Sequence, residues 1–386
     1  MTRPHEDNAG LTPDAPRRTR LTWRARWRRR GRLLAGLCVV LCFYAAALAA
    51  DFLAPYDYRA QARREPGAPP SVLHFRAADG RWHTRPFIYA RRLTDPLART
   101  YNEDATRAYP LALFTRGYSY RLFGLFETDR HLFGLLSDEG RAQGQDEPVN
   151  VSRASVETAP RVYLLGTDAS GRDRLSRLLR ATRFSLLVGP LGTLLAGALG
   201  ILVGCAAGYA GRKTDAVLMR AADAMLALPE LVLILAARAA FPITLQPTEA
   251  ALLLVVLFAA VGWAEPARLT RGLVLALRRR EFVLAAEGLG LTQPRILWRH
   301  ILPNAARPLV IQVSLMLPAF LLAETALSYL GVGVQEPEAS WGNMLAAASD
   351  LTQLAAQPFV LLAPAAAIFL FVLGVRLLSD GLKTDR

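Results

Sequence analysis

The sequence predicts an all-α membrane protein with six transmembrane helices and a small extracytoplasmic insert between the first two. Hydrophobic residues make up 52% of the 386 residues, and the mean hydropathy is +0.22. These residues gather in runs of about twenty, the length that crosses the roughly 30 Å hydrocarbon core of a bilayer. A soluble enzyme of this length would instead divide into domains with polar surfaces.

Six segments pass the test of length and polarity for a membrane span: residues 33–53, 184–209, 222–241, 249–265, 308–330 and 356–379. The third is the least apolar, because it contains Asp223 and Glu230 with Pro229 beside them. Membrane helices tolerate such residues where they face other helices or a wet cavity. We therefore expect this segment to lie partly buried inside a bundle.

The distribution of positive charge predicts the orientation. Ten arginines precede the first span, and eight lie in the loop 266–307, so both regions are expected in the cytoplasm together with the C-terminal tail. The loops 242–248 and 331–355 contain no Lys or Arg and are expected outside. The stretch 161–183 disagrees, since it carries six arginines on the outer side. It follows a long translocated loop, for which the charge rule is weak.

These considerations divide the chain into four parts: a basic cytoplasmic tail (1–32), a first transmembrane helix (33–54), an extracytoplasmic insert (55–160) and a transmembrane core (161–386). The first helix could alternatively be a signal peptide, because Ala47 to Ala50 offers a cleavage site. Its apolar run is longer than the 7 to 15 residues of a signal core, which favours a retained anchor.

The insert has enough aromatic residues to bury a small core. Alternation in 71–75 and 82–89, around Asp79-Gly80, predicts a hairpin, and 137–159 has the composition of a linker. Residues 170–183 are expected as an amphipathic helix on the membrane surface, with Ser170 and Asp173 as a capping box, or else as the solvated first turns of the second span.

The second span contains a small residue at every fourth position: Gly192, Ala196, Gly200, Gly204 and Gly208. Such a stripe lets another helix approach closely, so helix packing explains it sufficiently.

Several classes of chemistry are excluded by missing motifs. The sequence has no P-loop, no GxSxG motif and no metal-ligand spacing among its five histidines, so no catalytic residue and no metal site are predicted. The net charge of +14 does not indicate nucleic-acid binding, because the arginines flank apolar runs. The cysteines lie inside apolar runs and imply no disulfide framework.

The loop 280–304 carries the most informative pattern. It predicts two short helices: the first ends at Gly290, which suits a left-handed helix cap, and the second begins near Thr292 and stops before Pro303. The small side chains of Ala285 and Ala286 would let a partner surface come close to the first helix. A plain pair of interfacial helices is the alternative interpretation.

This loop resembles the EAA loop of ABC importer permeases. That pattern is Glu-Ala-Ala, three residues, Gly, nine residues, a hydrophobic position, one residue, then Leu-Pro. The positions in register are Ala285, Ala286, Gly290, Leu302 and Pro303. Leu284 replaces the first Glu of the pattern, Glu281 and Glu287 lie on either side of it, and His300 stands at the hydrophobic position.

Further segments are similar to the dipeptide, oligopeptide and nickel branch of this family: 165–173, 175–179, Trp263 with Ala267, Arg268 and Arg271, then 324–333 and 340–345. The resemblance covers about 165–386 and implies a MetI-like ABC permease core in a bacterial inner membrane. It implies coupling to ATP hydrolysis through Glu281, Ala285, Ala286, Glu287, Gly290, Leu302 and Pro303.

The same resemblance implies the partners. These are a homologous second permease subunit, cytoplasmic P-loop ATPase subunits and an extracytoplasmic solute-binding protein, in a membrane lipid environment. ATP and Mg would be bound by the partner ATPase, with no cofactor in this chain. The expected cargo is a peptide, or nickel.

Charged residues inside membrane spans are candidates for function, and Asp223, Glu230 and Glu324 qualify. Pairing with a neighbouring helix is an equally good explanation for each. Two other functions stay open: a proton-driven secondary transporter, and a membrane-anchored extracytoplasmic binding or sensing module whose working part is the insert.

Overall fold

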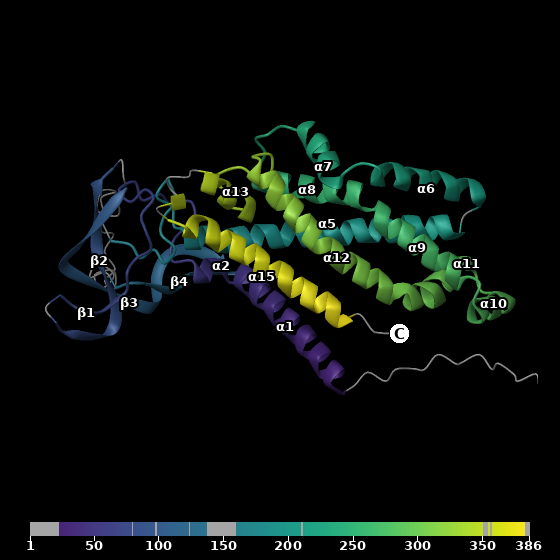
Figure 1. Cartoon of the computed structure of the whole chain (residues 1–386), viewed down its shortest axis with the longest axis horizontal. Helices are drawn as coiled ribbons and strands as arrows, with labels where there is room; N and C mark the ends of the chain where they lie inside the picture. Colours follow the sequence, from purple (N-terminus) through teal and green to yellow (C-terminus); the bar gives the residue numbers. More distant parts are fainter. Residues whose placement is uncertain are drawn as a thin grey trace, which may run out of the picture.

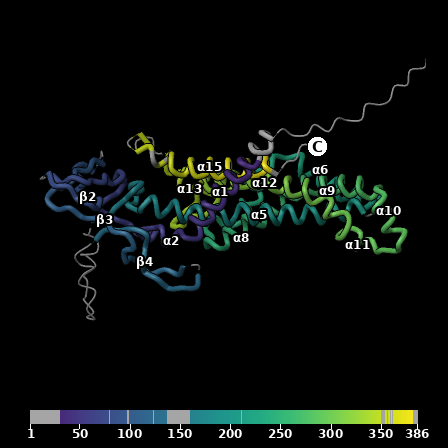
Figure 2. Tube along the Cα trace, turned by 90° about the horizontal axis from the view of Figure 1, so that it is seen from below, coloured from purple at the N-terminus to yellow at the C-terminus, as the bar shows by residue number. Residues whose placement is uncertain are grey.

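The molecule is elongated, with a β-sheet at one end and a helical bundle extending from it (Figures 1 and 2). The computed structural model describes residues 23–78, 80–96, 99–122, 124–136, 160–209, 211–349, 354–355 and 357–382. The predicted linker 137–159, most of the basic tail and residues 383–386 lie outside the described residues.

The helical elements begin and end as follows: α1 Trp23–Leu48, α2 Ala50–Leu53, α5 Arg174–Tyr209, α6 Arg212–Leu226, α7 Glu230–Ala239, α8 Pro247–Gly262, α9 Ala264–Leu277, α10 Glu281–Gly288, α11 Gln293–Ile296, a π-helical turn Leu297–Ile301, α12 Leu302–Tyr329, α13 Trp341–Ala346, a 3₁₀ turn Ala347–Ser349 and α15 Phe359–Leu382. The strands are β1 His74–Arg76, β2 Trp82–Asp95, β3 Thr100–Leu122 and β4 Phe126–Leu135.

Four stretches of helix among the described residues are long and apolar enough to cross a membrane: Arg30–Leu48, Arg174–Tyr209, Gln293–Tyr329 and Leu362–Gly381. The pair α8 and α9, bent by 44°, passes the same test as one broken span. The predicted third span is instead divided between α6 and α7. Pro229 explains the break, because proline has no N–H to donate and disfavours helical conformation in the residue before it.

The stripe of small residues on α5 packs against α8 and α9. A Cβ atom added to Gly192 would lie 2.7 Å from Phe258, one on Gly200 2.5 Å from Pro266, and one on Gly208 2.6 Å from Val274. The packing role predicted for the stripe is confirmed. Because the partner positions rise together along both chains, α5 runs parallel to α8 and α9.

Two other pairs of helices run antiparallel. On α12, Leu321 lies against Gly189 and Val313 against Gly197. On α15, Gly381 lies against Leu33 near the start of α1, and Gly374 lies against Val39. The apolar core follows these contacts, with the Phe258 and Phe320 rings stacked at 4.9 Å between centroids. Helix α5 therefore has parallel neighbours, α8 and α9, and an antiparallel neighbour, α12.

The insert folds as an antiparallel sheet of order β1-β2-β3-β4. The predicted first hairpin is confirmed, because β1 pairs with β2 through His74 opposite Phe87 and Arg76 opposite Trp82. Asp79, one of the two residues around which the hairpin was predicted, lies outside the described residues. The sheet stands at the end of the molecule opposite to α10 and α11 (Figure 1).

Residues 170–183 do not form a separate surface helix. The α5 helix begins at Arg174 and continues without interruption to Tyr209, and Arg174 and Arg177 are buried. Asp173, rather than Ser170, caps its start: the Asp173 carboxylate accepts hydrogen bonds from the N–H and hydroxyl of Ser176. The amphipathic pattern arose because arginines on this turn have carboxylate partners, which the sequence alone does not reveal.

Candidate functional site

The segment 280–304 forms the end of the bundle farthest from the sheet (Figure 1). Helix α10 ends at Gly288, and Gly290 follows with φ of +75°, the left-handed conformation predicted for it. The N–H of Leu291 then donates to the carbonyl of Ala286 at 3.2 Å, which closes the helix end. Helix α11 begins at Gln293 after Thr292, also as predicted.

One face of this segment packs inward. Val283, Ala286, Ile296 and Ile301 are buried together in a cluster that also includes Val274 of α9. Leu302 packs against the same cluster. The small side chain of Ala286 therefore serves close packing within the chain, whereas the sequence interpretation assigned it to a partner.

The other face is open. Leu284 is 53% exposed and Leu289 is 80% exposed, and the side chains of Glu281, Ala285 and Glu287 are exposed as well. Two exposed leucines flanked by carboxylates form a surface that a second protein can cover. All seven predicted coupling residues lie in the one continuous segment 280–304, and Ala286 is the only one of them that is fully buried.

The sequence predicted that the second helix of this segment stops before Pro303. In the structure it does not stop there. A π-helical turn at Leu297–Ile301 leads directly into α12, in which Pro303 occupies the first turn and is exposed. Proline lacks an N–H and its ring crowds the carbonyl four residues earlier. The wider π turn relieves this crowding, so the helix passes through.

The three predicted intramembrane acids have different environments. Glu324 on α12 is fully buried and accepts hydrogen bonds from Ser185 of α5 at 2.8 Å and from Ser328 at 2.9 Å. Asp223 is exposed on α6, with its carboxylate 3.3 Å from the Arg268 guanidinium. The structure therefore does not bring these two acids together.

Glu230 lines a cavity of about 260 Å³ between helices of the bundle. Glu265 and Gln312 are the other polar side chains of its lining, which is otherwise apolar and includes Met316 and Phe320. The cavity lies where α7, α9 and α12 meet. Charged groups are costly in hydrocarbon, so the carboxylates of Glu230 and Glu265 require water or a partner protein in the cavity.

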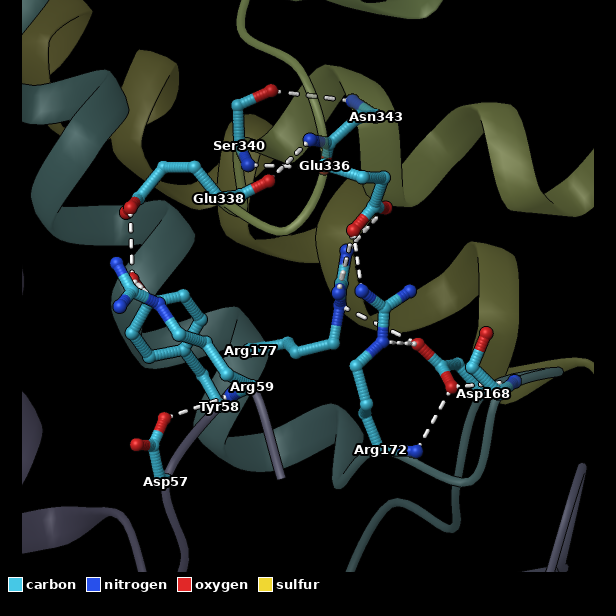
Figure 3. A network of polar contacts seen from close by, with 11 residues as sticks. Asp57, Tyr58, Arg59, Asp168, Arg172, Arg177, Glu336, Glu338, Ser340 and Asn343 are labelled. Atoms are coloured by element: carbon cyan, nitrogen blue, oxygen red, sulfur yellow. Dashed lines mark hydrogen bonds and ion pairs between the residues drawn. The ribbon is translucent and has the colours of Figure 1, made fainter. Parts of the chain in front are cut away.

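At the opposite end of the bundle, the start of α5 is held by a network of ion pairs (Figure 3). We name this network the polar cluster; it comprises Tyr58, Asp168, Arg172, Arg177, Arg180, Glu336 and Glu338. Arg177 donates to Glu336 at 2.8 Å, and Arg172 donates to Asp168 at 2.7 Å. The loop after α12 is thereby fastened to the start of α5.

The second half of the polar cluster reaches the insert. Arg180 pairs with the buried carboxylate of Glu338, which also accepts a hydrogen bond from the Tyr58 hydroxyl at 2.9 Å. Next to it, Arg183 pairs with Asp51 of α2 at 2.8 Å. Four of the six arginines that contradicted the charge rule, Arg172, Arg177, Arg180 and Arg183, are therefore paired with carboxylates within the protein.

Burial alone would raise the pKa of Glu336, but the Arg177 and Arg172 guanidiniums outweigh burial and hold this pKa below its usual value. The loop carboxylate therefore stays charged at neutral pH and keeps both arginines paired. Glu336, Glu338 and Asp51 were missed by the sequence analysis. The signal that could have found them is the group of outer arginines itself, because so many charges at a membrane boundary require partners.

Two family models match the chain. Residues 200–384 match the binding-protein-dependent transport system inner membrane component, and residues 18–70 match the N-terminal transmembrane domain of oligopeptide transport permease C. The oligopeptide transport system permease protein OppC of Bacillus subtilis is 34% identical over 221 residues, which cover 57% of this chain and 70% of that protein. A Brucella suis protein provisionally named a peptide permease is 36% identical over 238 residues, covering 61% and 77%.

The chain belongs to the family of inner-membrane components of binding-protein-dependent transport systems. A solved structure of the MetNI methionine ABC transporter in inward-facing conformations is also similar, with a TM-score of 0.40, 13% identity, and coverage of 54% of this chain and 94% of the other. The resemblance stated from the sequence is thus confirmed at the level of the family. Residues 280–304, which resemble the family's EAA loop in sequence, lie within the matched range 200–384.

Proposed function

We propose that this permease subunit imports peptides, with ATP hydrolysed by a separate ATPase that docks on the segment 280–304. The observation that supports this most directly is the open face of that segment. Leu284, Ala285 and Leu289 are exposed at the tip of the bundle, whereas the opposite face is packed into the chain. The peptide cargo rests on the names of the relatives; nickel is the other cargo of the resembling branch.

We propose six membrane crossings, with the N- and C-termini and the segment 280–304 in the cytoplasm and the insert outside. The parallel arrangement of α5 with α8 and α9 supports this count, because the chain between them must return across the membrane. Residues 210–246, which contain the broken pair α6 and α7, make that return. Pro229 then lies inside the third crossing.

The remaining partners follow from the same proposal. A homologous second permease covers the surface of the bundle near the Glu230 cavity. A solute-binding protein delivers the cargo on the side of the insert. ATP and Mg are bound by the ATPase subunits. The chain itself supplies no catalytic group; it transmits a change between two states of the assembly.

The test is an Ala285→Arg variant in a complex reconstituted with the second permease, the ATPase subunits and the solute-binding protein encoded beside it. A long charged side chain on the open face should abolish co-purification of the ATPase and ATP-driven peptide uptake. Trp82→Arg, an equally drastic change at an exposed position of the insert, is the control and should keep both. Normal co-purification and uptake with Ala285→Arg would contradict the docking proposal.

The two alternative functions predict different results. A proton-driven transporter would lose uptake with an uncoupler and keep it after ATP depletion. A membrane-anchored binding module would lose its function when residues 55–136 are deleted, whereas an accessory insert would leave transport measurable.

A further inference from the structure

The β3–β4 hairpin is the part of the insert that its own sheet does not cover. β4 pairs with the second half of β3 only, from Leu111 opposite Leu135 to Leu122 opposite Phe126. β1 and β2 pair with the first half of β3 or with each other. The hairpin therefore extends beyond the rest of the sheet as a two-stranded ribbon, an arrangement that is marginally stable in water without further packing.

The base of this hairpin is fixed to the outer end of the first two spans. The His131 ring is buried and makes hydrogen bonds with the carbonyls of Asp51, at 2.9 Å, and Tyr118, at 3.0 Å. The ring of Phe114 lies 6.2 Å from that of Phe52, in α2. Because Asp51 also pairs with Arg183, the hairpin has a defined position relative to α1 and α5.

The hairpin extends from this base toward the helices and not away from them. Figure 2 shows the β4 segment beside α2, with its turn directed along the bundle. From His131 to the turn is about six residues, or roughly 20 Å of extended strand. That reach exceeds the roughly 5 to 10 Å thickness of the headgroup region on one side of a bilayer, so the tip can reach the acyl chains.

The tip carries apolar side chains that the described residues of the chain leave exposed. Leu125 is 78% exposed and Phe126 is 67% exposed. Two arginines, Arg116 and Arg121, stand on the same ribbon, are exposed, and lie 3.8 Å and 3.7 Å from their cross-strand carboxylates. Aromatic and aliphatic tips with adjacent arginines are typical of segments that lie in a membrane interface.

The apolar surface is continuous with the lipid-facing side of the first span. Leu41 and Leu48 of α1 are both exposed in the bundle, and α2, with Phe52, follows directly after Leu48. Phe114 then joins this surface to the hairpin. A solute-binding protein would approach from the far side of the sheet, so the lipid surface is the occupant that this direction favours.

We propose that the tip of the β3–β4 hairpin, formed by Leu122, Gly124, Leu125 and Phe126, inserts into the membrane leaflet on the side of the sheet. Leu125 and Phe126 lie among the upper acyl chains, and Arg116 and Arg121 contact lipid phosphates. The insert is then held at the membrane surface by two attachments, the polar cluster at the start of α5 and this hairpin. The proposal depends on the chain being membrane-embedded and not on the cargo or the ATPase.

The test uses a nitroxide spin label on the full-length chain, with Cys38, Cys42 and Cys205 replaced by serine, in vesicles of phosphatidylethanolamine and phosphatidylglycerol. Collision with oxygen reports acyl chains, and collision with a water-soluble nickel chelate reports solvent. A label at Leu125→Cys should collide preferentially with oxygen. A label at Trp82→Cys, 76% exposed near the β1–β2 turn, is the matched control and should collide preferentially with the chelate.

Three results would overturn the proposal. The first is a Leu125 label with the chelate preference of the Trp82 label, which would place the tip in water. The second is a Leu125 label shielded from both reagents once the second permease is present, which would place the tip in a protein interface. The third is an unchanged collision preference of a Phe126→Cys label when Leu125→Asp is added. If the tip lies in lipid, the added charge should move the label toward water and raise its collisions with the chelate.

Discussion

The two ends of the helical bundle are stabilised by opposite means. At the start of α5, buried arginines and carboxylates join three segments that are distant in the sequence: the first residues of the insert, residues 168–180 and the loop 336–338. At the other end, α10 and α11 pack one apolar face into the chain and leave Leu284 and Leu289 open. Among the described residues of α10 and α11, no ion pair within the chain is found.

The difference indicates where the molecule completes its own structure and where it needs a partner. Buried ion pairs fix a geometry, because breaking one leaves a charge without compensation. An exposed apolar face fixes nothing until another surface covers it. The end with the insert is therefore held by contacts within the chain, whereas the end formed by residues 280–304 presents an apolar face that another protein can cover.

The largest effect is expected from Gly290→Arg. The backbone at Gly290 has φ of +75°, which costs an ordinary residue roughly 1–2 kcal/mol, and the new side chain would project into open space where the ATPase is proposed to bind. ATP-driven uptake should be abolished while the protein still reaches the membrane. Gly290→Asn is the control, because asparagine accepts this conformation, and it should retain most of the uptake. Equal loss in both would point to unfolding instead.

A smaller effect is expected from Glu324→Ala. Removal of the buried carboxylate leaves the hydroxyls of Ser185 and Ser328 without their acceptor, at a cost of about 2–3 kcal/mol. The midpoint of unfolding in detergent should fall accordingly. Asp223→Ala, which removes an exposed carboxylate from its pair with Arg268, should change stability by no more than about 1 kcal/mol. Equal midpoints for the two variants would contradict the distinction.

Arg177→Ala tests the polar cluster at the start of α5. Its guanidinium is buried and pairs with Glu336, which is half-exposed, so the loss is expected to be about 1–2 kcal/mol. Limited proteolysis should show faster cleavage in the loop 331–340, with no change at α10. Arg116→Ala is the control, because its carboxylate partner lies 3.8 Å away and both side chains are exposed. Unchanged cleavage of the loop in Arg177→Ala would show that the polar cluster does not hold it.

The smallest effect is a dependence on pH. Because the pKa of Glu336 is lower in the folded protein than in the unfolded chain, its pairing stabilises the fold fully above about pH 4.5 and loses this contribution as the pH falls through the lowered value. The unfolding midpoint should therefore fall more steeply with acidification in the wild type than in Glu336→Gln. Parallel curves between pH 7 and pH 3.5 would contradict the assignment.

Local patterns predicted much of the fold. The runs of apolar residues located α1, α5, α8, α12 and α15, although α1 and α5 each begin ten residues before the predicted start, and Gly290 and Thr292 marked a helix end and a helix start correctly. The stripe at Gly192 to Gly208 predicted close packing, since its spacing is set by the helix alone. These features depend on residues near one another in the chain.

Features that depend on distant residues were not predictable. The partners of Arg177 and Arg180 lie 158 residues or more along the chain, so a helix with solvated arginines was expected where a buried network exists. Ala286 and Ala285 look equivalent in sequence, yet one is buried and the other exposed. The break at Pro229 depended on whether neighbouring helices would compensate for the proline.

Because the helix continues through Pro303, two distant points of the chain lie on one continuous helix. The 37 residues from Gln293 to Tyr329 form a single helical span, roughly 55 Å long at 1.5 Å per residue. One end packs against α10, and the other carries Glu324, which accepts a hydrogen bond from Ser185 of α5. A displacement of the end at α10 that tilts this helix must slide Glu324 against α5 or break its hydrogen bond to Ser185, so a movement at one end of the bundle would reach the other without passing through any intermediate loop.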